Sequence, residues 1–191
     1  MKKRLIVGIT GASGTVYGIR ILEVLKDLGI ESHLVMSDSA KLTMAAETDY
    51  KPARIEAMAD VVHSAKNIGA SISSGSFQSL GMVIAPCSIR SLSEIASGVT
   101  SSLVSRAADV VLKERRRLVL LVRETPLHAG HLRSMSQVTE CGGIIMPPVP
   151  AFYSKPQSLN DMVNHTVGRC LDQFGIDNSL AYRWNGMDGR K

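Results

Sequence analysis

The chain has 191 residues, of which 45% are hydrophobic and 20% charged, and 22 Lys and Arg against 17 Asp and Glu give a net charge of +5. This apolar content excludes intrinsic disorder and is sufficient for a domain with a sizeable core. The longest aliphatic run, 118–122, is far shorter than the roughly 20 residues that a membrane-spanning helix needs.

Short apolar strands alternate along the chain with segments whose apolar residues have helical spacing. This alternation predicts an α/β fold, with a mostly parallel sheet of five or six strands and helices on both faces. We expect a single domain over 1–191 with a C-terminal tail from about 176. The expected strands are 3–9, 32–36, 81–85, 117–123 and 143–146, the third of them ended by Pro86. The expected helices are 16–28, 38–48, 88 onward, 102–115, 131–141 and 159–174.

Ligands of parallel α/β proteins bind at the carboxyl ends of the strands. This rule selects the segments that follow the expected strands as candidate sites. They are 10–14, 37–38, 86–91, 123–128 and 147–153.

The first of these segments belongs to the sequence GITGASG (8–14), which is neither GxGxxG nor a P-loop. Its small residues let the backbone approach a ligand, and the next helix presents N–H groups and a positive dipole end. A nucleotide or flavin site and a ligand-free tight turn both fit. Nicotinamide binding favours an acid after the second strand, where Asp38 stands, but Ser37 before it suits a flavin's ribityl chain or phosphate as well as a ribose.

The second segment places Ser88 and Ser91 in the first turn of a helix, where hydroxyls and free N–H groups favour an anion. Cys87 beside them has two interpretations, a nucleophile with a depressed pKa or a packed and inert thiol, and we favour the second. The third segment begins with Arg123 and Glu124, which form either part of the ligand edge or a surface ion pair.

Two histidines and three prolines mark the remaining segments. His128 and His131 have a spacing that suits a metal on one helical face, but no third ligand is near, so we favour capping or hydrogen bonding. Prolines make the segment 147–150 stiff and extended, and it leads to Phe152 and Tyr153. This segment is either a rigid structural loop or a substrate wall in which Tyr153 offers a hydroxyl.

Several classes of partner and site are disfavoured. The only dense basic run is 113–117, and an aromatic content of 4% is too low for a base-stacking surface, so we expect no nucleic-acid partner. Three cysteines without CxxC spacing argue against disulfides and structural zinc. The basic start 1–4 is followed by only three apolar residues before Gly8, too few for a signal peptide, and we expect a cytoplasmic protein without a membrane anchor.

Taken together and in this order, the motifs resemble the flavin prenyltransferases, the UbiX and phenylacrylic acid decarboxylase-associated family of flavoproteins. The joint presence of GASG, RETPLH and MPPVPAFY makes the resemblance specific, and it spans nearly the whole chain. The matching segments are GITGASG (8–14), Ser37, ETDY (47–50), SGSF (74–77), PCS (86–88), RAADVVLKERR (106–116), LVRETPLH (121–128), MPPVPAFY (146–153), Arg169 and LDQFG (171–175).

The resemblance implies a flavodoxin/Rossmann-like fold and a homododecamer built from trimers. It also implies a substrate pair, reduced FMN and dimethylallyl phosphate. Family members join the prenyl group to N5 and C6 of the flavin, and the prenylated FMN serves UbiD-type decarboxylases.

The resemblance also implies roles for individual residues. FMN contacts map to Gly11, Ala12, Ser13, Ser37, Ser88, Ile89, Arg90, Ser91 and Arg123. Prenyl-phosphate contacts map to Lys113, Tyr153 and Arg169, with Arg106 and Glu124 as further site residues, and proton handling maps to Ser13 and Glu47. The chain departs from the family at Arg117, where members often have proline, and in 62–72, which lacks a tryptophan that some members have.

The residue chemistry fits this assignment. Breaking an allylic C–O bond requires stabilisation of the departing phosphate dianion, and the chain has no Asp-rich motif for Mg²⁺. Lys113, Arg169 and Arg106 suit direct neutralisation of the phosphate without a metal, and Glu124 suits acid or base work near it.

Two other classes of function remain open. FMN-dependent decarboxylases of cysteinyl peptides use a His base near the first helix, and 15–18 has none. Non-catalytic flavin carriers are normally acidic, unlike this chain.

Overall fold

The computed structural model describes residues 2–186. Its sheet has six strands in the order β3-β2-β1-β4-β5-β6, and every neighbouring pair is parallel. The α/β fold with a parallel sheet is therefore confirmed, in the strand order of Rossmann folds. The strands are β1 (Arg4–Ile9), β2 (Glu31–Met36), β3 (Val61–Ser64), β4 (Gly81–Cys87), β5 (Arg117–Val122) and β6 (Ile144–Ile145).

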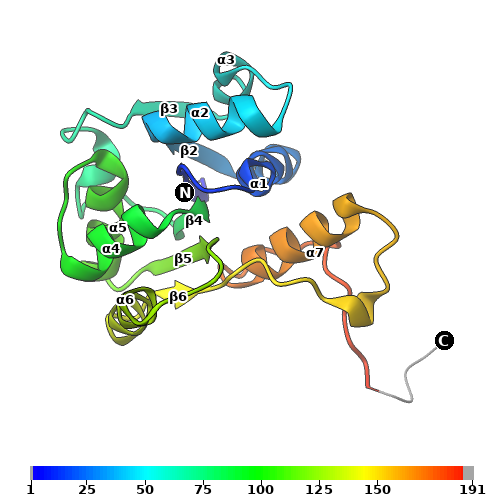
Figure 1. Ribbon diagram of the computed structural model, residues 1–191. Helices are drawn as coiled ribbons and strands as arrows, with labels where there is room; N and C mark the ends of the chain where they lie inside the picture. Colours follow the sequence, from blue (N-terminus) through cyan, green and yellow to red (C-terminus); the bar gives the residue numbers. More distant parts are fainter. Residues whose placement is uncertain (1, 187–191) are drawn as a thin grey trace.

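Helices cover both faces of the sheet and make the three expected layers (Figure 1). On one face, apolar side chains of α1, α2 and α7 pack against the strands, and on the other those of α4, α5 and α6 do so. The helices are α1 (Thr15–Asp27), α2 (Asp38–Glu47), α3 (Pro52–Glu56), α4 (Ile89–Ser97), α5 (Leu103–Lys113), α6 (Ala129–Glu140) and α7 (Leu159–Asp172), with short 3-10 turns η1 (Ser71–Ser73) and η2 (Phe152–Ser154).

Two expectations about the strands need correction. Pro86 does not end the third expected strand, because β4 continues to Cys87, which pairs with Val122 of β5 after a register shift. The edge strand β3 was not anticipated. It is only four residues long and alternates half-buried with exposed positions, so it lacks the continuous apolar run that marks the central strands.

The strand order reverses between β1 and β4, so the loops after these two strands flank a crevice at the carboxyl edge. Thr10, which is 1% exposed, joins the two loops. Its hydroxyl donates to the Pro86 carbonyl at 2.8 Å and accepts from the Ser88 N–H at 2.8 Å. The fold thereby fixes the starts of α1 and α4 relative to each other.

Two further expectations concern the cysteines and the membrane. Cys87 and Cys170 are buried, and burial raises the pKa of both thiols well above the usual range, so they are inert packing residues at neutral pH. Within residues 2–186, no helix combines the length and the apolar character needed to cross a membrane.

Candidate active site

The turn after β1 is held in a shape that only small residues allow. A Cβ atom on Gly11 would lie 2.5 Å from the side chain of Ser39, so a larger residue there would clash with α2. Gly14, with φ of 104°, has the left-handed conformation that turns the chain into α1. This turn brings Gly11, Ala12 and Ser13 to the carboxyl edge, as expected for a ligand loop.

The start of α1 is occupied by a carboxylate of the chain itself. Glu47, the last residue of α2, accepts hydrogen bonds from the Gly14 N–H at 2.9 and 3.1 Å and from the Thr15 N–H at 3.1 Å. Partial burial raises the pKa of Glu47, but hydrogen bonds from the Ser13 hydroxyl and these N–H groups outweigh it, and the pKa lies below its usual value. Glu47 is therefore ionised at neutral pH, and part of the anion-binding capacity expected of this turn is used within the chain.

A cavity of about 340 Å³ lies beside this turn, and we call it the serine cavity. The Ser37 hydroxyl caps α2 by accepting from the Ala40 N–H at 3.1 Å, and the Ser88 hydroxyl caps α4 by accepting from the Ser91 N–H at 3.3 Å. Two helix starts thus meet at one cavity. It is lined by Ser37, Asp38, Ser39, Ala65, Lys66, Ser88, Arg90, Ser91, Glu94, Ser101 and Ser102.

The charged groups of the serine cavity form pairs. Arg90 lies 2.9 Å from Glu94, and Lys66 lies 4.0 Å from Asp38. Because each carboxylate faces a cation, the hydroxyls and helix starts give the cavity a donor-rich lining that suits a phosphate. Four expected FMN contacts, Ser37, Ser88, Arg90 and Ser91, therefore lie together.

Two other expected FMN contacts adjoin the same edge. Ile89 is the first residue of α4, directly after the capping Ser88. Arg123 follows β5 and is exposed, and its N–H donates to the carbonyl of Cys87 at 3.1 Å, which holds it beside the end of β4. Glu124 is also exposed at this edge, and its Oε1 accepts from the Thr125 N–H at 3.1 Å.

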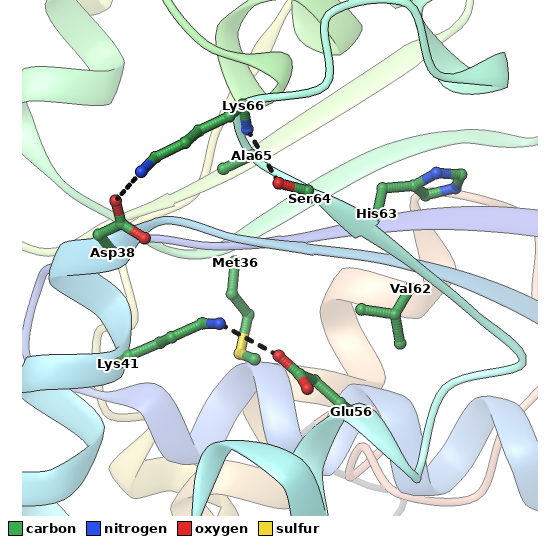
Figure 2. Close-up of a pocket in the computed structure, with 9 residues that line it drawn as sticks. All are labelled: Met36, Asp38, Lys41, Glu56, Val62, His63, Ser64, Ala65 and Lys66. Atoms are coloured by element: carbon green, nitrogen blue, oxygen red, sulfur yellow. Dashed lines mark hydrogen bonds and ion pairs between the residues drawn. The ribbon is translucent and has the colours of Figure 1, made fainter.

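A second hollow, of about 310 Å³, adjoins the serine cavity and shares Asp38, Ala65 and Lys66 with it (Figure 2). Figure 2 shows Lys41 reaching toward Glu56, 3.2 Å away, and Lys66 toward Asp38. Both lysines are paired with carboxylates, so this hollow offers no excess positive charge. None of the expected site residues lines it.

Tyr153 and Arg169 take part in a cluster at the other end of the chain. The Tyr153 hydroxyl lies 3.3 Å from Nε2 of His165, and Arg169 pairs with Asp172 at 2.9 Å. Arg183 also donates to Asp172, at 2.8 Å between Nη2 and Oδ1. We call these five residues the Tyr153 cluster. The rings of Tyr182 and Trp184 lie 6.0 and 6.1 Å from that of Tyr153.

Three members of this cluster, His165, Asp172 and Arg183, were not predicted from the sequence. One face of α7 carries His165, Arg169 and Asp172, because Arg169 lies four residues after His165 and three before Asp172. This spacing from the predicted Arg169 could have identified the other two. Arg183 belongs to the expected tail, whose residues 187–191 lie outside the described residues. No local pattern shows where a tail residue packs.

Arg106 and Lys113 do not lie near the Tyr153 cluster within one chain. Both belong to α5, where Arg106 pairs with Asp109 at 2.9 Å and Lys113 pairs with Glu114. Lys113 ends α5 just before β5 begins, which places it at the amino edge of the sheet, opposite the serine cavity. Figure 1 also draws α5 and α7 on opposite sides of the molecule. Their shared role stays a prediction that requires a second copy of the chain.

One histidine of the pair caps a helix, and Nδ1 of the other, His131, is buried without a hydrogen-bond partner among the described residues. His128 accepts from the Gly130 N–H at 3.0 Å as the N-cap of α6, and its ring lies 3.6 Å from that of His131. Among residues 2–186 no three His, Cys, Asp or Glu side chains gather as metal ligands would. The capping interpretation of His128 is confirmed.

Comparison with known proteins gives the family. The family model described as "Flavoprotein" matches residues 1–171. The flavin prenyltransferase UbiX of Escherichia coli K12 is 62% identical over 187 residues, which cover 96% of this chain and 99% of the relative. This chain belongs to the flavin prenyltransferase family.

Two solved structures are similar to this flavin prenyltransferase family member over nearly its full length. AnUbiX (PadA1), in complex with FMN and dimethylallyl pyrophosphate, has a TM-score of 0.96 at 50% identity and covers 97% of this chain and 99% of its own. A dodecameric FMN-dependent Ubix-like decarboxylase from Escherichia coli O157:H7 has a TM-score of 0.93 at 47% identity, with 96% and 100% covered. The family expected from the motifs is thus confirmed.

Proposed function

We propose that this protein joins the dimethylallyl group of dimethylallyl phosphate to N5 and C6 of reduced FMN. The observation that carries the proposal is the presence of two separate groups of side chains that suit an anion, the serine cavity and the Tyr153 cluster. A flavin carrier needs only one such group, whereas a transferase that uses a phosphorylated co-substrate needs two. The relatives' names and the complex with FMN and dimethylallyl pyrophosphate support it.

The carboxyl edge would hold the FMN. The hydroxyls of Ser37, Ser88 and Ser91 and the start of α4 suit its phosphate and ribityl chain, and the shape of the turn at Gly11 lets the backbone approach a flat ring. Arg123, at the same edge, suits a carbonyl or phosphate oxygen. When bound in reduced form, FMN supplies the nucleophilic N5 and C6 positions.

The Tyr153 cluster would hold the phosphate of the prenyl substrate. As the allylic C–O bond breaks, its electron pair stays on the phosphate, whose growing charge Arg169 and the Tyr153 hydroxyl would stabilise. Each such donor contributes roughly 2–4 kcal/mol to the transition state. Glu124 would donate or accept a proton near the phosphate. Ser13 and Glu47 would handle a proton at the flavin side, and the ionised state of Glu47 makes it the acceptor.

We further propose that the site is completed in a homo-oligomer, a dodecamer like that of the Ubix-like decarboxylase. Arg106 and Lys113 of one subunit would then approach the Tyr153 cluster of another, which accounts for their separation within one chain. The product, prenylated FMN, would pass to a UbiD-type decarboxylase. We place the reaction in the cytoplasm, where both phosphorylated substrates are available.

Incubation with reduced FMN and dimethylallyl phosphate, followed by mass spectrometry of the flavin, tests the proposal. We expect a flavin heavier by one C5H8 unit, formed equally well in the presence of EDTA. A parallel incubation with the pyrophosphate shows which leaving group is preferred. If FMN binds but its mass stays unchanged, the result favours a non-catalytic flavin carrier. Release of CO₂ from a cysteinyl peptide would favour an FMN-dependent decarboxylase.

A further inference from the structure

His165 is a buried side chain with one specific polar contact. It is 8% exposed, and its Nε2 atom lies 3.3 Å from the Tyr153 hydroxyl, with the two rings nearly perpendicular at 84°. Its other ring nitrogen, Nδ1, is buried without a hydrogen-bond partner among the described residues. Tyr153 itself is half exposed, so its hydroxyl can reach a ligand on the side away from His165.

The surroundings of His165 decide where its proton resides. A neutral imidazole carries one N–H donor and one acceptor nitrogen. Nδ1 has no partner in either tautomer, but a buried N–H without an acceptor is rarer in proteins than a buried acceptor without a donor, and a proton on Nε2 has the Tyr153 oxygen to donate to. The contacts therefore favour the tautomer with the proton on Nε2.

The charges around His165 keep it neutral. Burial has the largest effect in lowering its pKa, the positive charges of Arg169 and Arg183 lower it further, and Asp172 opposes them. Lys155 and Asp161 line the hollow that His165 also lines, and they carry opposite charges. A neutral ring retains an acceptor at Nδ1 and one donor at Nε2.

We propose that His165 is a positioning residue that donates from Nε2 to the Tyr153 oxygen and so directs the hydroxyl hydrogen outward, toward the phosphate of the prenyl substrate. A hydroxyl oxygen that already accepts from His165 leaves its own hydrogen free for the ligand. Arg169 lies one helical turn after His165 on α7, so the second phosphate donor extends from the same helix face. This inference rests on the proposed function, because it needs a phosphate at Tyr153.

Two substitutions that differ by one methylene group test this role. His165→Gln places its amide near the former Nε2 position and keeps a donor to Tyr153, whereas His165→Asn places its amide near the former Nδ1 position and loses that donor. With FMN-loaded oligomer titrated with dimethylallyl phosphate, we expect roughly fivefold weaker binding for His165→Asn and binding within about twofold of the parent for His165→Gln. In a Tyr153→Phe background, His165→Asn should cause no further loss.

The outcomes separate this inference from the proposed function. If the parent binds and converts the prenyl phosphate while His165→Asn binds it like the parent, or loses equally in the Tyr153→Phe background, the inference is wrong and the function stands. If the parent does not bind the prenyl phosphate, both are wrong. FMN affinity and the thermal midpoint of each variant show whether a loss reflects unfolding, and a loss in both variants alike would also overturn the role of His165.

Discussion

The serine cavity and the Tyr153 cluster are built in different ways. The serine cavity uses hydroxyls and backbone N–H groups at helix starts, and the buried hydroxyl of Thr10 holds the neighbouring loop after β1 against the start of α4. The Tyr153 cluster uses long side chains from η2, α7 and the tail, and Tyr153 itself is 53% exposed. The serine cavity, the proposed flavin site, therefore follows from the topology of the sheet. The Tyr153 cluster, the proposed phosphate site, depends on packing between segments far apart in the chain.

A carboxylate of the chain occupies hydrogen-bond donors at the turn beside the serine cavity, and another does so within the Tyr153 cluster. Glu47 accepts two backbone N–H groups at the start of α1, and Asp172 accepts from Arg169 and Arg183. The hydrogen bond from Arg183 is the main cause of a lowered pKa at Asp172, so this carboxylate is ionised at neutral pH. Asp172 holds the Arg169 guanidinium in place, so the proposed phosphate would have to share Arg169 with this carboxylate.

The largest expected effect distinguishes a phosphate-binding role of Arg169 from a structural one. Arg169→Ala should reduce turnover by about 100-fold, because a cation beside the departing phosphate is lost. FMN affinity should not change, and stability should fall little because the Arg169 side chain is half exposed and Asp172 keeps its hydrogen bond from Arg183. Arg117→Ala is the matched control, since Arg117 is exposed at the opposite edge of the sheet. Equal turnover of the two variants would remove Arg169 from the site.

The next effect concerns the assembly. Lys113→Ala and Arg169→Ala should each be nearly inactive alone. If a site combines Arg169 of one subunit with Lys113 of another, oligomers reassembled from an equal mixture should regain about a quarter of the parental activity, since one site in four then has both residues. Mixing without dissociation is the control. Activity that stays at the level of the single variants would contradict a site shared between subunits, and full activity of Lys113→Ala alone would exclude Lys113 from the site.

At the serine cavity, a substitution that adds a negative charge but leaves the fold intact tests whether the FMN phosphate binds there. Ser37→Asp keeps a good helix cap for α2 but adds a negative charge, and we expect FMN to bind about tenfold more weakly or worse because its phosphate is repelled. Ser37→Asn caps equally well without the charge and should bind FMN within a few-fold of the parent. Titration of both variants with FMN compares them directly. Equal affinities would place the phosphate away from Ser37.

The same contrast explains what the sequence could and could not predict. The strands β1, β4 and β5 are continuous apolar runs, so their existence and the loops at their carboxyl ends were predictable. The edge strand β3 was missed because it is short and half exposed. The serine cavity could be anticipated because the carboxyl ends of parallel strands meet at one edge.

The Tyr153 cluster could be anticipated only in part. Tyr153 was a candidate from its place after the proline-rich segment, and Arg169 came from the family resemblance. The contact of Tyr153 with His165 and that of Arg183 with Asp172 depend on how η2 and the tail fold onto α7. Neither contact has a local sequence signature. The separation of α5 and α7 could not be predicted from the sequence either. The site residues of a family do not reveal which subunit supplies each of them.

The smallest expected effect concerns Glu47, whose two assigned tasks can be separated by pH. As a cap, its lowered pKa stabilises the fold above the pKa of the unfolded chain, and this contribution is lost as the pH falls through the folded-state pKa. Because the side chain is exposed, Glu47→Gln should cost at most about 1 kcal/mol at neutral pH, and its thermal midpoint should converge with the parent's in acid.

Glu140→Gln removes the same charge at the exposed end of α6, where Glu140 accepts from the hydroxyl of Ser136, and it is the matched control for the loss of a surface carboxylate. The turnover of Glu47→Gln then decides whether Glu47 also accepts a proton in the reaction. A cap alone predicts that Glu47→Gln keeps its turnover at neutral pH once FMN is saturating. A proton acceptor predicts a loss that saturating FMN does not restore, because glutamine keeps one acceptor oxygen for the helix start but cannot take up a proton. In the second case the turn after β1 contributes chemistry as well as geometry, and the contrast between the two regions narrows accordingly.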